Sequence, residues 1–318
     1  MEKVNIITVN YNSSGDLLHC IASVMKSDYK NFQLFAVDNH STDDSLNRIE
    51  EGAEKLGISM LRITARQLQE MKNEEALQGQ LVLIENEIND GFAAGNNVAL
   101  RHLIKHRDQE FVWLLNPDVE VDPSVMTHLI EVHGNQDKVL TGNVINYFND
   151  RKQVMYWGGF KVRKFIHGIR NITSREEEAK IDAIAGASLF TNVDTFRTLG
   201  LLPENYFLYW EETDFCTKAT RNGFNFNVNS KSKIYDRVGG ASSGNFTREY
   251  LYILSGLRFY RKYYPAYLVS VVVSVFLKLM VSIVGTRLKR RAIYFGLVDF
   301  FRLGLGRKVN IKARISQQ

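Results

Sequence analysis

Short apolar runs alternate with amphipathic stretches along the first half of the chain. Runs of the length of a buried strand occur at residues 4–10, 32–37 and 111–115 and near Ile58 and Leu81. Helical spacing is found between them, at residues 17–26, 44–56, 98–105 and 123–133. This alternation predicts an α/β protein with a mostly parallel sheet and helices on both faces, a Rossmann-like nucleotide-binding fold.

The second half has a less regular pattern. Residues 160–175 are rich in Lys and Arg, which predicts either a mobile loop near a phosphate-bearing substrate or an ordinary solvated loop. Residues 181–190 predict a buried strand in which Gly186 and Ala187 leave room for a ligand. The polar stretch 66–80 is interpreted as a surface insertion.

Polar residues follow three predicted strands where each strand ends. Asn10 and Tyr11 follow the first, Asp38 follows the second, and Asn116-Pro117-Asp118 follows the run at 111–115. Open α/β sheets bind ligands at the carboxyl ends of their strands, and a carboxylate there offers a hard oxygen to a divalent cation. The alternative for Asn116-Pro117 is an ordinary turn, since both residue types favour turns.

Two more segments carry candidate chemistry. Asn89, Gly91 and the residues up to Asn97 precede a predicted helix, and glycine lets a backbone approach a ligand closely. Residues 206–214 place Glu211, Glu212 and Asp214 behind aromatic residues. Carboxylates crowded by like charges in an aromatic setting have a raised pKa, as a general base requires. Asp214 could instead stabilise the N-terminus of a helix predicted at 215–222.

Composition narrows the class of protein. A chain of 318 residues with 45% hydrophobic residues predicts one large domain, residues 1–249, and an appendage, residues 250–318. Two cysteines and no recognisable signal peptide favour a reducing compartment over a disulfide framework. The net charge of +5 comes without a basic stripe interleaved with aromatic residues, so no nucleic-acid partner is expected. No Gly-x-Gly-x-x-Gly follows the first strand, which disfavours a dinucleotide oxidoreductase.

Taken in order, these segments resemble the inverting glycosyltransferases of family 2, which have the GT-A fold. The resemblance runs from about Val4 to about Ser243. Its motifs are Thr8, Asn10, Tyr11 and Asn12, the stretch 37–43, Asn89 with Gly91 to Asn97, Leu115 to Asp118, and Glu211, Glu212 and Asp214. Within the family the chain most resembles rhamnosyltransferase-like enzymes of bacterial surface polysaccharide biosynthesis.

The resemblance implies roles for individual residues. A nucleotide-sugar donor, linked to UDP, dTDP or GDP, would be bound by Thr8, Asn10, Tyr11, Asp38, Asn89, Gly91, Asn96 and Asn116. Asp118 would bind Mg²⁺ or Mn²⁺, and Asp236 stands where the family often has a metal-binding or diphosphate-binding histidine. The base would be Glu212, with Glu211 as the second candidate and Asp214 beside them.

Three of these positions keep alternatives. Asn116 replaces an acidic residue of the usual family motif, and Glu212 replaces the usual aspartate. Asn96 could simply cap the helix that follows it. The departures at Asn116 and Asp236 leave two functions open: an inverting, metal-dependent transfer to a glycan or lipid-linked acceptor, or a catalytically inactive nucleotide-sugar-binding or assembly subunit. A nucleotidyltransferase would need a basic phosphate loop near residues 11–16, where the chain has no Lys or Arg.

The C-terminal part contains an apolar stretch at residues 267–284 with basic residues on both sides. A membrane span needs roughly 20 apolar residues with few charges, and this stretch includes serines and Lys278. The pattern therefore predicts a helix that lies on the cytoplasmic face of an inner membrane, with the flanking cations near anionic lipid. The alternative is a buried helix of the core or of a homodimer contact.

Overall fold

The computed structural model describes residues 2–71, 77, 79–134, 136–237, 246–282 and 286–316. Over these residues it contains one mixed sheet. The strands are β1 (Val4–Asn10), β2 (Phe32–Asp38), β3 (Met60–Thr64), β4 (Leu81–Glu85), β5 (Phe111–Leu115), β6 (Val119–Val121), β7 (Val139–Tyr147), β8 (Val154–Trp157), β9 (Gly159–Val162), β10 (Ile169–Asn171), β11 (Ala183–Ile184), β12 (Ser188–Asn192) and β13 (Asn225–Asp236).

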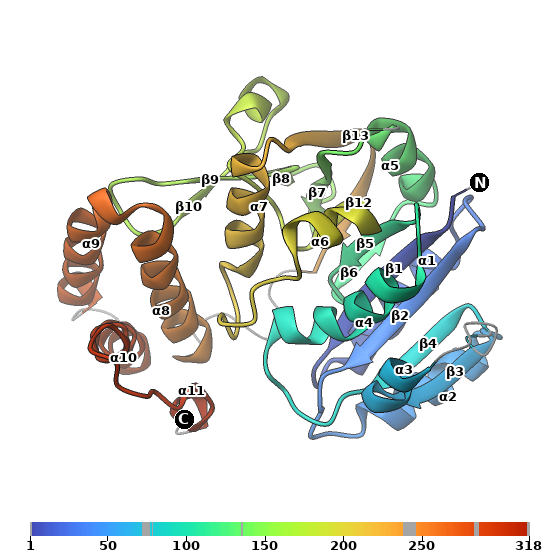
Figure 1. Ribbon diagram of the computed structural model, residues 1–318, viewed down its shortest axis with the longest axis horizontal. Coiled ribbons are helices and arrows are strands. Elements are labelled where there is room, and N and C mark those ends of the chain that lie inside the picture. The colour runs from blue at the N-terminus through green and yellow to red at the C-terminus, as the bar shows by residue number, and fades with distance from the viewer. Residues whose placement is uncertain are drawn as a thin grey trace.

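Helices cover both faces of the sheet and form a separate group beside it (Figure 1). They are α1 (Ser14–Val24), α2 (Ser45–Lys55), α3 (Ala65–Glu70), α4 (Phe92–His106), α5 (Val125–His133), α6 (Val193–Leu199), α7 (Glu211–Arg221), α8 (Phe246–Tyr263), α9 (Leu268–Val281), α10 (Arg287–Gly304) and α11 (Ile311–Ile315).

The N-terminal half of the sheet is parallel, as the sequence predicts. Strands β5, β1, β2, β4 and β3 lie in this order, and each neighbouring pair is parallel. Because successive side chains of a strand point to opposite faces, Ile7 packs in the core that includes α4, α6 and α7, while Ile6 packs in the core that includes α1, α2 and α5. β12 then joins β5 to β7 in antiparallel fashion, so the sheet continues without a gap.

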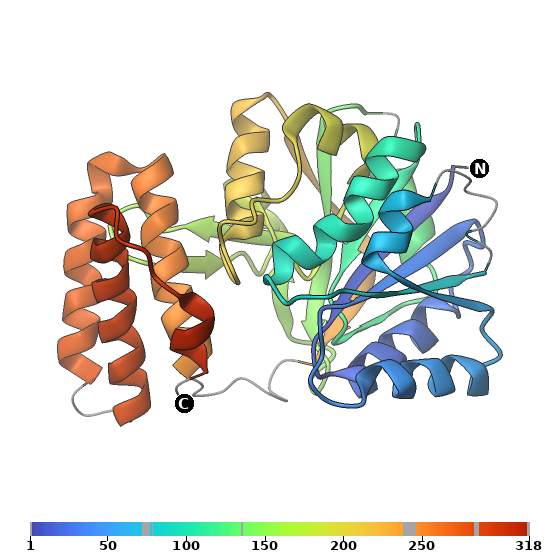
Figure 2. The same ribbon diagram turned by 60° about the horizontal axis from the view of Figure 1, so that its bottom comes forward.

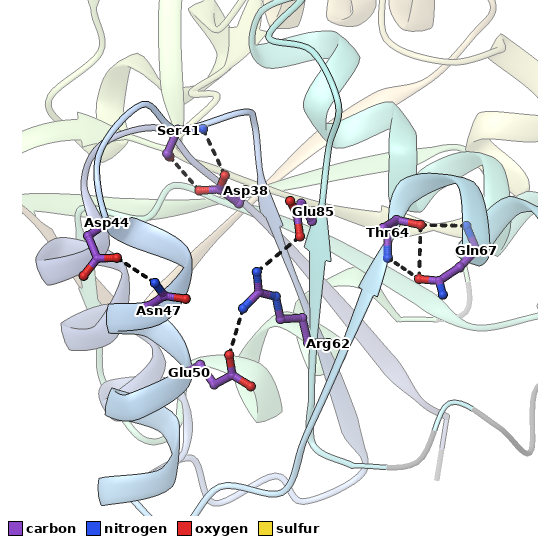
Figure 3. Close-up of polar contacts among 9 residues, drawn as sticks. All are labelled: Asp38, Ser41, Asp44, Asn47, Glu50, Arg62, Thr64, Gln67 and Glu85. Atoms are coloured by element: carbon purple, nitrogen blue, oxygen red, sulfur yellow. Dashed lines mark hydrogen bonds and ion pairs between the residues drawn. The ribbon is translucent and has the colours of Figure 1, made fainter.

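Polar contacts stabilise the other edge of the sheet, around β3 (Figure 3). Arg62 of β3 forms ion pairs with Glu50 of α2 at 2.9 Å and with Glu85 of β4 at 3.3 Å. Thr64 and Gln67 form a reciprocal capping box that begins α3. Leu68 of α3 is fully buried, so the segment predicted as a surface insertion contributes to the core.

Helices α4 and α7 both begin earlier in the chain than predicted, and both differences affect the candidate site. α4 begins at Phe92, so Asn96 lies inside the helix and does not cap it. α7 begins at Glu211, four residues before the predicted start, so Glu211 and Glu212 occupy its first turn. The basic segment 160–175 contains the antiparallel pair β9 and β10 and is therefore not a single loop.

The helices α8, α9 and α10 pack together and also against the sheet domain. Their shared core includes Val162, Tyr206 and Trp210. In both views α8 lies between α9 and the sheet (Figures 1 and 2). Among the described residues no helix combines the length and the apolar character needed to cross a bilayer.

α9 has two different sides. Val271, Val275 and Leu279 are buried, and Lys278 forms an ion pair with Glu249 of α8, so one side packs inside the protein as the buried-helix alternative requires. The opposite side is exposed. The predicted domain boundary after residue 249 falls inside α8, and the division into two domains stays a prediction.

Candidate active site

The ends of β1 and β2 lie side by side, and their polar residues bond to each other. Asn10 is paired with Asp38 in the parallel register, and its Nδ2 donates to Asp38 Oδ1 at 2.7 Å. Ser41 donates its hydroxyl to Asp38 Oδ1 at 2.6 Å and its backbone N–H to Oδ2 at 3.0 Å (Figure 3). Asp38 is fully buried, so these contacts satisfy its charge. Thr8 is also buried and its hydroxyl has no hydrogen-bond partner, while Tyr11 is exposed at the rim.

Gly91 joins the polar loop after β4 to the acidic and aromatic segment. Its φ is +96°, and a Cβ there would lie 1.9 Å from the carbonyl oxygen of Phe207. The next residue, Phe92, donates its N–H to that same oxygen at 3.0 Å. Asn89 supports the turn by accepting from Asn39 Nδ2 and from the Gly91 N–H, both at 3.0 Å. Only glycine fits this position, because the conformation and the close approach both exclude a side chain.

Asn96 lies within α4 and not in the loop before it. It is buried in α4, and its Nδ2 donates to the carbonyl oxygen of Phe92 at 2.9 Å. The donor-binding roles of Thr8, Asn10, Tyr11, Asp38, Asn89, Gly91 and Asn96 stay predictions.

A strained turn places the acidic residues. Tyr209 and Trp210 both have positive φ, +66° and +75°, and such a conformation is costly for aromatic residues. Trp210 is the N-cap of α7, and its carbonyl oxygen accepts a hydrogen bond from the backbone N–H of Asp214 at 2.8 Å. Glu211 and Glu212 therefore lie at the positive end of the helix dipole, where negative charge is favoured.

A cavity of about 500 Å³ opens in front of this turn. Four of the predicted site residues line it: Asn116, Glu211, Glu212 and Asp236. Gly186 and Ala187 line it as well, and a Cβ on Gly186 would lie only 3.2 Å from Glu212 Cγ. The small residues between β11 and β12 thus leave space directly against the candidate base.

The carboxyl groups at the cavity are electrostatically unusual. Burial, and then the neighbouring charge of Glu212, raise the pKa of Glu211 well above its ordinary value. Burial raises the pKa of Glu212 to about 7, although backbone N–H groups at the start of α7 oppose the shift. Glu211 Oε2 is buried without a hydrogen-bond partner. A carboxyl group with a pKa of about 7, as Glu212 has, is suited to accept a proton near neutral pH.

Asp118 directly precedes β6, and Asp236 ends the neighbouring strand β13 and lines the cavity. Asp236 is opposite Val119 in the antiparallel pair of β13 and β6, and the N–H of Arg237 donates to the carbonyl oxygen of Asp118 at 3.0 Å. Asp118 Oδ1 is buried without a hydrogen-bond partner, and burial, followed by the charge of Asp16, raises the pKa of Asp118.

These two carboxylates fit a hard divalent cation such as Mg²⁺ or Mn²⁺, which prefers oxygen ligands. No cluster of three or more His, Cys, Asp or Glu side chains suitable for a metal occurs in the part of the chain that is described. A cation here would therefore need oxygens from water and from the substrate phosphates as further ligands.

Asp214 does not line the cavity. Its buried carboxylate accepts hydrogen bonds from the hydroxyls of Tyr206 and Tyr263, at 2.9 and 2.7 Å. Lys262 of α8 forms an ion pair with it at 2.7 Å. The carboxylate thus links α7 to α8, and a part for Asp214 in the reaction stays a prediction.

The cavity residues that the sequence analysis missed include Tyr147, Tyr156, Arg248 and Tyr252. Tyr147 and Tyr156 come from β7 and β8, and Arg248 and Tyr252 come from the first turns of α8. Burial, and then the charge of Glu212, raise the pKa of Tyr156 to about 12, so this phenol stays protonated. No local pattern marks these residues, because they come from β7, β8 and α8, which are far apart in the sequence and meet only in the folded protein.

The sheet, the strand-end polar residues and the acidic helix start define a nucleotide-sugar transferase fold of the GT-A type, and solved structures support this. The mannosyltransferase PcManGT from Pyrobaculum calidifontis, in complex with GDP-Man and Mn²⁺, superimposes with a TM-score of 0.58 at 14% identity, over 99% of this chain and 84% of that one. The family model described as "Glycosyl transferase family 2" matches residues 5–190. The chain belongs to this family, as the sequence motifs indicate.

Two curated relatives are similar over part of their length. A low-salt glycan biosynthesis hexosyltransferase, Agl10 of Haloferax volcanii, is 24% identical over 144 residues, 45% of this chain and 47% of the relative. The UDP-Glc:α-D-GlcNAc-diphosphoundecaprenol β-1,3-glucosyltransferase WfgD of Escherichia coli is 20% identical over 158 residues, 48% and 53% of the two chains. The chain thus spans about half the length of each of these relatives.

Proposed function

We propose that the protein is a metal-dependent inverting glycosyltransferase that transfers a sugar from a nucleotide-sugar donor to a glycan or lipid-linked acceptor. The observation that carries the proposal is the pair Glu211 and Glu212, which lines, together with Asp236, a cavity large enough for a sugar. Family membership and the hexosyltransferase relatives support the same class of reaction.

In the proposed reaction, Glu212 accepts the proton of the acceptor hydroxyl. The acceptor oxygen then forms a bond to the anomeric carbon of the donor sugar from the side opposite the diphosphate. The bond from the anomeric carbon to the phosphate oxygen breaks, its electron pair stays with the nucleoside diphosphate, and the single displacement inverts the anomeric centre. A divalent cation held by Asp118 and Asp236 would neutralise charge on the leaving diphosphate.

Glu212 is the preferred base for a geometric reason. The absence of a Cβ at Gly186 leaves open space beside its side chain, whereas Glu211 is almost fully buried. Burial and the neighbouring charge of Glu212 raise the pKa of Glu211 well above its ordinary value, so a neutral Glu211 beside it suits Glu212 as the base of the pair. Asn116, at the end of β5, would contact the donor.

The donor would carry UDP, dTDP or GDP, and the rhamnosyltransferase-like motifs favour a role in cell-surface polysaccharide biosynthesis. The relative from Escherichia coli is named for a diphosphoundecaprenol-linked acceptor, which supports a lipid-linked acceptor here. Such an acceptor would place the protein at the cytoplasmic face of an inner membrane. The second candidate function, an inactive nucleotide-sugar-binding or assembly subunit, is favoured by Asn116 in place of the usual acidic residue.

Donor binding and transfer can be tested separately. Purified protein with Mn²⁺ is heated with each of a panel of UDP-, dTDP- and GDP-sugars, because a ligand that binds only the folded state raises the Tm. We expect one donor to raise the Tm, Asp118→Ala to abolish that rise, and Glu212→Gln to keep it while losing transfer. Glu54→Gln, on the exposed side of α2, is the matched control and should keep both.

The outcomes separate the two candidate functions. A donor that binds without any transfer or donor hydrolysis in the wild-type protein would support the assembly subunit. Folded protein that is stabilised by none of the donors would contradict the glycosyltransferase and favour a subunit with a role in assembly alone.

A further inference from the structure

Exposed apolar side chains are concentrated on one part of the surface. Fifteen large apolar residues are exposed among those described, and only Tyr11, Leu56 and Ile88 lie outside the C-terminal helices and the loop beside them. The other twelve comprise Phe165 and Ile166 in the loop between β9 and β10, six residues of α9, and four residues on or just after α10. Contiguous exposed apolar surface of this kind marks a binding face.

The six exposed residues of α9 lie on one side of the helix: Val269, Val273, Phe276, Leu277, Met280 and Val281. Their spacing places them within a single arc of the helix surface. Since α9 has 14 residues, this apolar strip is about 21 Å long. Phe165 extends the strip at the start of α9, where its ring contacts that of Tyr267 with centroids 4.9 Å apart.

The same region has a large excess of basic over acidic residues. Residues 250–318 contain 13 of the 40 Lys and Arg residues but only one of the 35 Asp and Glu residues, Asp299. That single acid is buried and paired with Arg314 and Arg302. The formal net charge is therefore +12 for residues 250–318 and −7 for residues 1–249.

Basic residues stand at both ends of the apolar strip. Arg163 and Lys164 are exposed beside Phe165. At the other end, Arg287, Lys289 and Arg290 occupy the first turn of α10, which has no acidic residue. The helix dipole disfavours cations at that end of a helix. These cations therefore destabilise the isolated helix, and contact with an anionic partner would compensate for that cost.

An apolar groove lies next to these cations. A cavity of about 460 Å³ between α9 and α10 is lined by Leu279, Met280, Tyr294 and Phe295, with Arg290 and Arg291 at its edge. This combination matches a phospholipid, which has an acyl chain and a phosphate a short distance apart.

We infer that α9, the first turn of α10 and the loop 163–168 form a docking face for a bilayer that contains anionic phospholipid. Phe276, Leu277 and the other exposed residues of the strip enter the acyl region, and the cations at both ends contact lipid phosphates. A second copy of the chain is the poorer partner, because pairing two such faces would bring two regions of charge +12 together.

The docking face is close to the cavity. The N–H of Ile169, at the end of the docking loop, donates to the hydroxyl of Tyr252 at 3.3 Å, and Tyr252 lines the cavity. A docked protein therefore holds its cavity near the headgroup layer, where a lipid-linked acceptor presents its sugar. The benefit of this orientation for catalysis rests on the proposed function. The docking to a bilayer does not depend on it.

Flotation of the full-length chain with vesicles tests the inference. We expect binding to vesicles of phosphatidylcholine and phosphatidylglycerol, and weak binding to phosphatidylcholine alone or at high salt. Leu277→Glu should weaken binding roughly tenfold or more, because it removes one inserted leucine. The double variant Arg287→Gln, Lys289→Gln should weaken it on the order of 30-fold, from about 1 kcal/mol for each cation near the lipid surface.

Matched controls carry the same chemical changes elsewhere. Leu56→Glu alters an exposed leucine after α2, and Lys30→Gln with Arg48→Gln removes two exposed cations of the sheet domain. Both controls should bind vesicles like the wild type. Equal binding to neutral and anionic vesicles, no binding by folded protein, or a dimer in solution that Leu277→Glu dissociates would each overturn the inference.

The donor-induced rise in Tm is measured on the same variants. A variant that no longer floats with vesicles but still shows the donor-induced rise in Tm is defective in docking alone. A wild-type protein that floats but shows no donor-induced rise in Tm would contradict the proposed function and leave the docking inference standing.

Discussion

Replacing Glu212 by glutamine should stabilise the protein, and the gain should depend on pH. Burial raises the pKa of Glu212 from 4.5 to about 7 in the folded protein. Between these two values the unfolded chain has released the proton that the folded chain still holds, so raising the pH through this window destabilises the fold. The shift corresponds to at most about 3 kcal/mol, at about 1.36 kcal/mol for each unit of pKa.

The effect on the Tm follows from the size of the chain. An entropy of unfolding of about 2.1 cal/mol/K per residue makes 3 kcal/mol equivalent to a change in Tm of about 4–5 °C. Glutamine is neutral at every pH, so Glu212→Gln should match the wild type near pH 4.5 and exceed its Tm by up to that amount above pH 7.

Thermal denaturation of both proteins at pH 4.5, 6, 7 and 8, without metal or donor, checks this expectation. Glu54→Gln, on the exposed surface of α2, is the control and should show no pH-dependent difference. An equal difference at all four pH values, or a variant less stable than the wild type at pH 8, would refute the reasoning that burial holds Glu212 protonated.

If Glu212 is the base, the rate of transfer, measured as kcat/KM, should rise with pH up to about 7 and then level off.

Three further predictions concern single residues. Asp118→Asn should weaken donor binding in Mn²⁺ by at least roughly tenfold, measured by calorimetry; unchanged affinity would remove Asp118 from the metal site. Gly91→Ala should cost more than about 3 kcal/mol, since its Cβ would meet Phe207 O, whereas Gly15→Ala, with open space around it, should change stability by less than about 1 kcal/mol; urea denaturation compares the two. Asp214→Asn should cost about 1–3 kcal/mol in the same assay but keep donor binding, and loss of binding by folded protein would show that the residue acts at the cavity.

The fold was predictable because its signals are local. The apolar runs at 4–10, 32–37 and 111–115 have the length of buried strands, and each is a strand of the parallel half of the sheet. Their polar ends were predicted to meet at one edge, and the hydrogen bond between Asn10 and Asp38 shows that two of them do. A residue that directly follows a strand can be placed once the order of strands is known.

Other features depend on contacts that a pattern of residues does not contain. The starts of α4 and α7 were placed too late. A glycine is required at position 91 because the carbonyl oxygen of Phe207, more than 100 residues away, leaves no room for a side chain. α7 begins after two aromatic residues with positive φ, a conformation that residue propensities do not predict for aromatic side chains. The conformations of Tyr209 and Trp210 are stabilised by tertiary packing, since Trp210 is buried against Tyr252 and Phe259 of α8.

Helix α8 connects the two surfaces on which the proposals rest. On one side Arg248 and Tyr252 form part of the cavity wall, and Ser255 donates to the carbonyl oxygen of Leu208 at 3.0 Å. On the other side α8 packs against α9, the centre of the docking face. The strained turn that places Glu211 is thus held by a helix that also supports the proposed docking face. Contacts across α8 therefore fix the distance between the candidate base and that face, which a flexible tether between two independent domains would leave variable.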